Sequence, residues 1–180
     1  KDLKIYNGDK ILVRKTGVGI TASLDYENAV TNQVVYILTL KPAVDRSLSL
    51  EFILAVLNSR AMTYYLIKKF GENEWRSHPY LTQTMLVNLP FPKIDFNSED
   101  VKDLISRVTK IVRDEVSQSK EKNIAKVNDL FIERVVAHFF KLNQTNYKAI
   151  FDTLSSSEQL ITIKRLLNCN TKEIFKINRI

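Results

Sequence analysis

Cysteine, glycine and proline are all scarce in this sequence of 180 residues. The one cysteine, Cys169, excludes an internal disulfide framework and fits a reducing compartment, so we expect a cytoplasmic protein. Glycine and proline number 4 each, which argues against long disordered segments. No apolar run is long enough to span a membrane and no secretory signal opens the chain, so we expect no membrane partner.

Motifs of catalysis and metal binding are also missing. The sequence has no Walker A pattern, no HExxH and no CxxC. The two histidines, His78 and His138, lack the spacing of metal ligands, and Cys169 has no nearby histidine to activate it. The stretch GVGITA at 17–22 resembles a nucleotide-binding fingerprint, but β-branched residues follow it where a helix is required. We interpret it as a loop and expect no catalytic residue and no metal site in this chain.

The composition that remains is that of a globular protein with excess positive charge. Hydrophobic residues make up 44% and charged residues 26%, which is enough apolar surface for a core. The formal net charge is +7. This charge favours an anionic partner such as nucleic acid, but only mildly, because many basic proteins bind nothing anionic.

The first half of the chain predicts strands followed by a long helix. Residues 10–14 and 33–40 are rich in Val, Ile and Tyr and predict strands, with another short strand between them. Apolar residues at helical spacing from residue 50 to residue 70 predict one continuous helix, capped by Ser49. Residues 81–89 then predict an extended segment.

The second half predicts helices alone. Ser98 starts the first of them, and Ser155 with Glu158 matches a capping box for a later one. The stretch VNLPFPKI at 87–94 separates the two compositions, and its prolines suit neither a helix interior nor a central strand. We therefore expect an α+β fold with a domain border at 93/94, and a helical tail over 94–180.

Cations and aromatic residues are the candidates for function. Arginine on loops suits phosphate contact and the reading of guanine edges, and aromatic rings suit base stacking. The alternative is that these side chains are ordinary solvated charges, and the residues alone weigh the two interpretations equally. The candidate residues are Lys10, Arg14, Lys15, Arg46, Arg60, Trp75, Arg76 and His78.

The order of the segments resembles a known family. KILVR, then AVLNS with a tyrosine-rich continuation, then LPFP before a helix, resemble the TaqI-type C-terminal target recognition domain of adenine-specific DNA methyltransferases. The resemblance covers about residues 8–94. It implies a small mixed sheet with a packed long helix, and a helical tail. It also implies that the landmarks serve the fold, with Phe91 packed at the junction.

The resemblance implies a function shared with a partner. The Asn-Pro-Pro-Tyr motif and the S-adenosylmethionine loop of such enzymes are absent here. The chain also begins without methionine, so we expect the recognition end of a longer enzyme. The implied partners are double-stranded DNA and a catalytic methyltransferase domain, in the same chain or in a partner subunit. S-adenosylmethionine would be the cofactor of that catalytic domain, and we expect no cofactor in this chain.

Two alternatives stay open at this point. The chain could be a stand-alone specificity subunit that recruits separate methylating and cleaving subunits. It could also be a protein-interaction module whose basic charge is incidental. An enzyme of this family reads DNA with such a domain but places its reactive groups elsewhere, so the chain itself carries no predicted active site.

Overall fold

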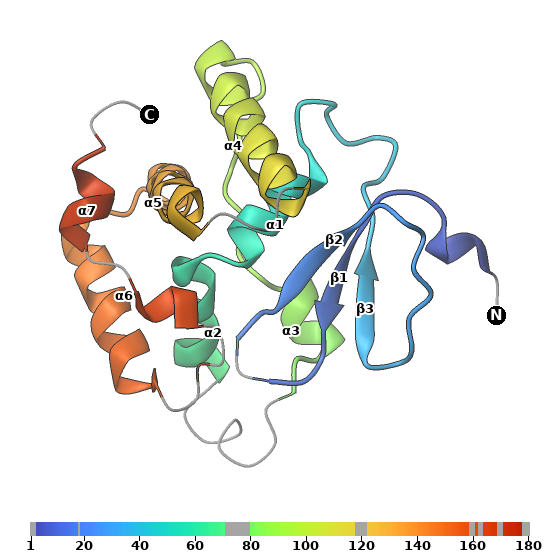
Figure 1. Ribbon diagram of the computed structural model, residues 1–180, viewed down its shortest axis with the longest axis horizontal. Coiled ribbons are helices and arrows are strands. Elements are labelled where there is room, and N and C mark those ends of the chain that lie inside the picture. Colours follow the sequence, from blue (N-terminus) through green and yellow to red (C-terminus); the bar gives the residue numbers. More distant parts are fainter. Residues whose placement is uncertain are drawn as a thin grey trace.

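The computed structural model describes residues 3–17, 19–70, 80–117, 122–158, 161, 164–168 and 171–177. A small sheet lies at one side of the molecule and helices form the remainder (Figure 1), which confirms the predicted α+β class. The elements in chain order are η1 (Leu3–Tyr6), β1 (Lys10–Arg14), β2 (Ala22–Asp25), β3 (Val35–Leu38), α1 (Leu50–Leu57), α2 (Arg60–Phe70), α3 (Gln83–Val87), α4 (Glu99–Ser117), α5 (Lys122–Phe139), α6 (Gln144–Ser156), η3 (Lys164–Leu167) and α7 (Thr171–Phe175).

The sheet has three strands in the order β2-β1-β3. The strand predicted at 10–14 is confirmed, the strand predicted at 33–40 is shorter, and the strand expected between them is β2. Both β2 and β3 run antiparallel to β1. The sheet is therefore purely antiparallel, and the expectation of a mixed sheet is wrong. Ile11 and Val13 are fully buried, whereas Arg14 is exposed.

The helix predicted over 50–70 is divided into α1 and α2. At the division, the hydroxyl of Ser59 donates to the carbonyl of Val56 at 2.8 Å and accepts from the N–H of Met62 at 3.2 Å. Asn58 ends α1, and its side chain bonds outside the helix. Side-chain bonds of this kind compete with the helical backbone ladder, so the prediction of a continuous helix is wrong.

Two short polar side chains cap helices nearby. Ser49 accepts from the N–H of Phe52 at 3.0 Å, which confirms the predicted start of α1. Thr82 accepts in the same way from the N–H of Met85 at 3.1 Å and starts α3. The segment 81–89 was predicted to be extended, and this cap explains why part of it is helical instead.

The later helices follow their apolar stripes, but one predicted cap is wrong. Ser98 accepts from the backbone at the start of α4, as predicted. Ser155 lies inside α6, so Ser155 and Glu158 form no capping box. The capping box is formed by Asn143 and Asn146, whose side chains each accept from the other's N–H at 2.9 Å.

No helix of the described part is long and apolar enough to cross a membrane.

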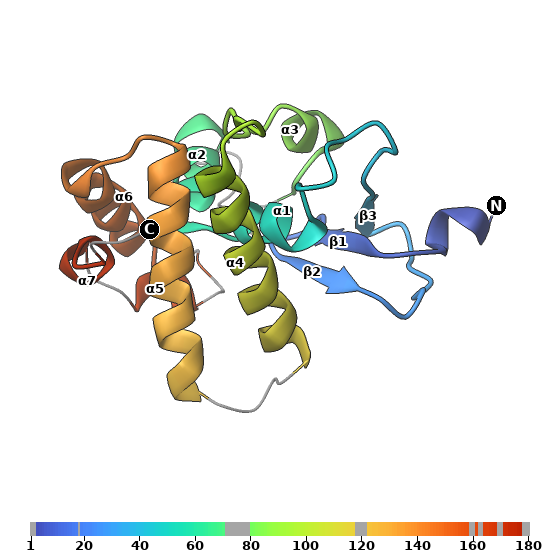
Figure 2. The same cartoon turned by 90° about the horizontal axis from the view of Figure 1, so that it is seen from above.

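One apolar core joins the sheet and α1 to the later helices. Figure 2 shows α4 lying between α1 and α5. The ring of Phe52 in α1 lies edge-on to Phe139 in α5, with centroids 5.3 Å apart, and edge-on to Phe91 at 6.5 Å. Phe91 thus contacts α1 although it is 43% exposed, and Pro92 next to it is buried. The division into 1–93 and 94–180 stays a prediction.

Two carboxylates with little exposure are held ionised by cations. Lys10 pairs with Asp25 on the neighbouring strand, and its ammonium also donates to the carbonyl of Tyr6 at 2.7 Å. The hydrogen bond from Lys10 keeps the pKa of Asp25 below its ordinary value, against the effect of burial. Burial also opposes ionisation of Glu51, but hydrogen bonds, chiefly from Arg113 at 2.6 Å, outweigh it and lower the pKa of Glu51.

We predict that the free energy of unfolding decreases as the pH falls through about 4. Folding lowers the pKa of Asp25 and Glu51, so their ionised forms stabilise the folded state above the ordinary carboxyl pKa. That contribution is lost as the carboxylates take up protons. Urea unfolding at a series of pH values measures the effect, and Asp25→Asn should be less stable at neutral pH with a flatter pH dependence. A curve for Asp25→Asn that runs parallel to the wild-type curve would contradict the assignment.

Candidate nucleic-acid interface

The end of β1 places an exposed arginine beside a turn. Arg14 is the last residue of β1, and its N–H donates to the carbonyl of Thr21 at 2.9 Å. Its Nη2 also donates to the hydroxyl of Thr21 at 3.4 Å. A Cβ on Gly17 would lie 2.5 Å from this Nη2, so the guanidinium rests against the glycine. Arg14 therefore projects into solvent from a turn that restrains its side chain.

Two tyrosines lie beside the next residue, Lys15. Its ammonium is 4.4 Å from the ring centroid of Tyr36, within cation–π range. Burial and the neighbouring Tyr80 raise the pKa of Tyr36, so this phenol stays protonated at neutral pH. Thr16 pairs with Tyr80, and the N–H of Leu81 donates to the carbonyl of Lys15 at 2.6 Å. Because Tyr80 is 45% exposed, a cation and an accessible aromatic ring share this end of the sheet.

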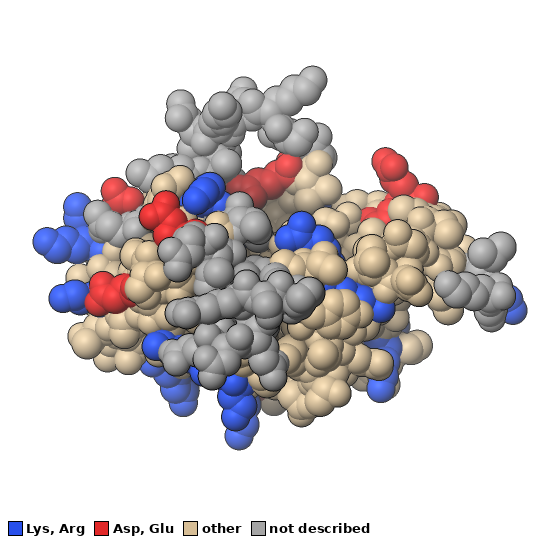
Figure 3. Space-filling model, turned by 90° about the horizontal axis from the view of Figure 1, so that it is seen from below, with Lys and Arg blue, Asp and Glu red and all other residues tan. Residues whose placement is uncertain are grey.

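The β1–β2 turn lies at the lower end of the molecule in Figure 1, and Figure 3 shows the molecule from below. In Figure 3, Lys and Arg side chains stand out along the lower margin, and Asp and Glu side chains are visible at the left and in the upper part of the same view. Lysine and arginine suit phosphate oxygens, arginine suits base edges, and aromatic rings suit exposed bases. The end of the sheet that carries Arg14, Lys15 and Tyr80 therefore has side chains suited to a nucleic-acid contact.

Two of the predicted contact residues are buried. Lys10 and Arg60 are both 0% exposed. Lys10 is paired with Asp25, and the guanidinium of Arg60 is held by Asp129 and Glu133. Neither cation can reach DNA in this structure, so these two predictions are wrong. The acids that bury Arg60 lie far away in the sequence, and spacing along the chain does not reveal them.

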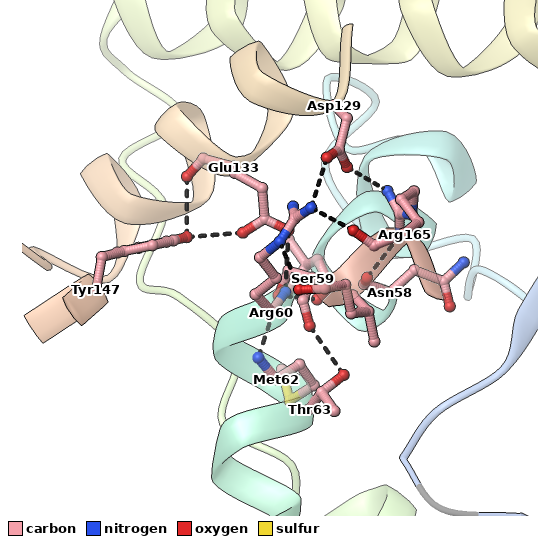
Figure 4. Close-up of polar contacts among 11 residues, drawn as sticks. Asn58, Ser59, Arg60, Met62, Thr63, Asp129, Glu133, Tyr147 and Arg165 are labelled. Atoms are coloured by element: carbon pink, nitrogen blue, oxygen red, sulfur yellow. Dashed lines mark hydrogen bonds and ion pairs between the residues drawn. The ribbon is translucent and has the colours of Figure 1, made fainter. Parts of the chain in front are cut away.

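Figure 4 shows how the Arg60 cluster is assembled at the α1–α2 division. Nη2 of Arg60 donates to Asp129 at 2.8 Å, and the carboxylate of Glu133 accepts from the backbone N–H of Arg60 at 2.9 Å. Nη1 lies 3.0 Å from the same Glu133 oxygen. The hydroxyl of Tyr147 donates to the other Glu133 oxygen at 2.8 Å. Arg60 also donates to two backbone carbonyls of η3, so the cluster joins α2, α5, α6 and η3.

Arg46 is exposed but lies away from Arg14 and Lys15. Since β3 runs antiparallel to β1, the chain leaves β3 at the end of the sheet opposite Arg14. The segment 39–49 accordingly occupies the upper part of Figure 1, whereas the β1–β2 turn is at the lower end. The structure brings Arg14 and Lys15 together and separates Arg46 from both.

The remaining predicted residues, Trp75, Arg76 and His78, lie outside the described residues, so their role stays a prediction.

The candidates predicted from the sequence did not include Tyr36 and Arg165. Tyr36 is found only from the strand register, which places it opposite the end of β1. The side chain of Arg165 is 43% exposed and lines the same hollow of about 370 Å³ as the β1–β2 turn. No sequence signal connects that arginine to the turn.

The glycine-rich stretch at 17–22 is a turn between strands. Gly17 and Gly19 have φ of 102° and 78°, and the chain continues into β2 rather than into a helix. The interpretation as a loop is confirmed, since a nucleotide-binding reading needs the N-terminus of a helix at this point. Within the described ranges, no three His, Cys, Asp or Glu side chains gather as a metal ion would require.

Comparison with known families decides what kind of domain this is. The family model of the TaqI-like C-terminal specificity domain matches residues 1–91. The chain belongs to this family. The match covers the sheet and α1 to α3, the part that carries Arg14 and Lys15, and assigns a DNA-recognition role in restriction–modification. A search of curated proteins finds no match to the chain.

The landmarks of the specificity domain have structural roles here. KILVR is the central strand, β1. In AVLNS, the amide of Asn58 bonds both backbone groups of Ala22 in β2, accepting from its N–H at 3.2 Å and donating to its carbonyl at 2.9 Å. Ser59, at the division between α1 and α2, donates a hydrogen bond from its hydroxyl to the carbonyl of Val56. Asn58 and Ser59 thus hydrogen-bond neighbouring backbone, which agrees with the expectation that the landmarks serve the fold.

We predict that Arg60→Met destabilises the fold by about 3–5 kcal/mol, because it removes the cation that pairs with the buried Glu133 and one of the two that pair with Asp129. Urea unfolding measures the change. Arg14→Ala is the matched control, since an exposed arginine should alter stability by no more than about 0.5 kcal/mol. Equal stabilities of wild type and Arg60→Met would show that Arg60 is not the partner of Asp129 and Glu133.

Proposed function

We propose that this specificity domain recognises duplex DNA for an adenine-specific methyltransferase, and that the duplex meets the end of the sheet carrying Arg14, Lys15 and Tyr80. The observation that carries the proposal is the exposed Arg14 at the end of the central strand, restrained by Thr21 and Gly17. A cation and an accessible aromatic ring stand next to it. The net charge of +7 agrees with an anionic partner.

Arg14 and Lys15 have different parts in this proposal. The planar guanidinium of arginine can donate twice to the O6 and N7 of a guanine, which discriminates between bases by about 1–3 kcal/mol. The ammonium of lysine is a point charge that suits phosphate oxygens and adds affinity without sequence information. Arg14 would therefore set sequence preference, and Lys15 would set affinity.

The domain would contribute to methylation by positioning. The target adenine has to leave the base stack to be methylated, at a cost of a few kcal/mol, and contacts to the surrounding duplex help to offset that cost. The reacting groups would belong to a catalytic domain in the same chain or in a partner subunit. S-adenosylmethionine does not fit the glycine-rich stretch of this chain, because the stretch leads into β2.

We predict that the full chain binds duplex DNA at low salt and loses affinity steeply as salt rises, because bound phosphates release counterions. Fluorescence anisotropy with labelled duplexes, from about 50 to 200 mM salt, measures it. Lys15→Ala should weaken binding to all duplexes alike and reduce the salt slope by about 1. Arg14→Ala should reduce the preference for the best duplex by roughly 5- to 150-fold.

The control for these variants is Arg46→Ala, since Arg46 is an exposed arginine at the opposite end of the sheet. It should leave both affinity and sequence preference unchanged. Absence of duplex binding at every salt concentration contradicts the proposed function. An effect of Arg46→Ala as large as that of Arg14→Ala would place the contact surface elsewhere.

A further inference from the structure

Asn58 occupies the position that a further strand would take beside β2. The strand order makes β2 an edge strand, and within the described ranges no strand pairs with its outer side. At Ala22 that outer side is taken by the amide of Asn58, which accepts from the N–H at 3.2 Å and donates to the carbonyl at 2.9 Å. An asparagine amide has one donor and one acceptor side, so it can pair with both groups as a peptide would. The bond fixes the backbone where the β1–β2 turn enters β2.

Arg14 is hydrogen-bonded by Thr21, the neighbour of Ala22 in the chain. Thr21 precedes Ala22 and binds Arg14 twice, through its carbonyl at 2.9 Å and its hydroxyl at 3.4 Å. The guanidinium also lies close to Gly17 in the same turn, since a Cβ on that residue would be 2.5 Å from Nη2 of Arg14. A shift of Ala22 would therefore move Thr21 and, with it, the guanidinium of Arg14.

Asn58 is itself held by the C-terminal region. Its backbone carbonyl accepts from Nη2 of Arg165 at 2.9 Å, and Nη1 of Arg165 pairs with Asp129 in α5. Arg60 donates to the carbonyl of Arg165 at 2.7 Å and so holds η3 in place. Figure 4 shows Arg165 between Asp129 and Asn58. The contacts thus run without a gap from α5 through Arg165 and Asn58 to the β1–β2 turn.

We propose that Asn58 and Arg165 are positioning residues that orient Arg14 for reading a base edge, so that the helical region sets the sequence discrimination of the domain. The proposal rests on the proposed function, in which Arg14 contacts a base. A guanidinium that donates twice to one guanine needs both N–H groups aligned in the base plane, whereas a charge near phosphates tolerates displacement. Loss of the Asn58 contact should therefore reduce discrimination much more than overall affinity.

The test uses the full chain and duplexes of defined sequence. Selection from a random duplex pool identifies the preferred sequence, and anisotropy then gives affinities for it and for its single-base-pair variants. Asn58→Ala should lose most of the discrimination that Arg14→Ala loses, while binding to non-preferred duplexes at low salt stays within about twofold. Asn58→Asp keeps the acceptor for the N–H of Ala22 but loses the donor, so it should fall between the wild type and Asn58→Ala.

The matched control is Asn88→Ala. Asn88 also ends a helix, but its amide donates within that helix, to the carbonyl of Thr84 at 2.8 Å. It should leave discrimination unchanged. Arg165→Gln provides a second route to the same test, with a reduced discrimination expected, if Asn58→Ala does not fold. Circular dichroism confirms that every variant is folded at the temperature of the binding assay.

The outcomes separate the inference from the proposed function. A wild-type chain that binds no duplex, or binds every duplex equally, overturns both. A wild type that discriminates, with Arg14→Ala impaired and Asn58→Ala and Arg165→Gln both unimpaired, overturns the positioning role alone. Equal losses of discrimination and of non-specific binding in folded Asn58→Ala also overturn it, because the effect would then be general. Selective loss of discrimination supports it.

Discussion

The burial of Arg60 is the constraint on which the rest of the structure depends. A guanidinium cannot be left unpaired in a protein interior, because the loss of hydration costs far more than packing returns. Arg60 begins α2, in the half of the chain that matches the specificity domain, yet both of its carboxylate partners come from α5. With Arg165 also paired to Asp129, the cluster balances two cations with two anions. Arg60 therefore joins α2 to α5 and η3 in the folded structure.

Other contacts also join the first half of the chain to the later helices. Glu51 in α1 is bound by Arg113 of α4, and Phe52 packs on Phe139 of α5. The helical region is thus more than a spacer behind the recognition domain, since it supplies core and charge to α1 and α2. A scaffold of this kind suits recognition, because loops that read DNA discriminate best when rigid elements hold them. In the proposed interface, Arg14 stands at the end of β1, where the strand leads into the β1–β2 turn.

Local patterns predicted the features that depend on neighbouring residues. The alternation in KILVR gave β1, and Ser49 and Ser98 marked the starts of α1 and α4. The predictions failed where partners distant in sequence decide the outcome. Lys10 and Arg60 read as surface cations until the acids that bury them are seen, and the bonds of Asn58 to β2 split a helix that periodicity predicted to be continuous. Arg14 and Lys15 could be proposed from the sequence, whereas their grouping with Tyr36 requires the strand register.

Native-state hydrogen exchange most directly tests whether the two halves form one cooperative unit. The informative comparison is between wild type and Glu133→Gln, which removes one buried charge from α5 without changing the size of the side chain. If the halves depend on each other through Arg60, the most protected amides of β1, α1 and α5 should open with one common free energy and lose protection equally in the variant. Loss of protection in α5 alone, with β1 and α1 unchanged, would contradict the account.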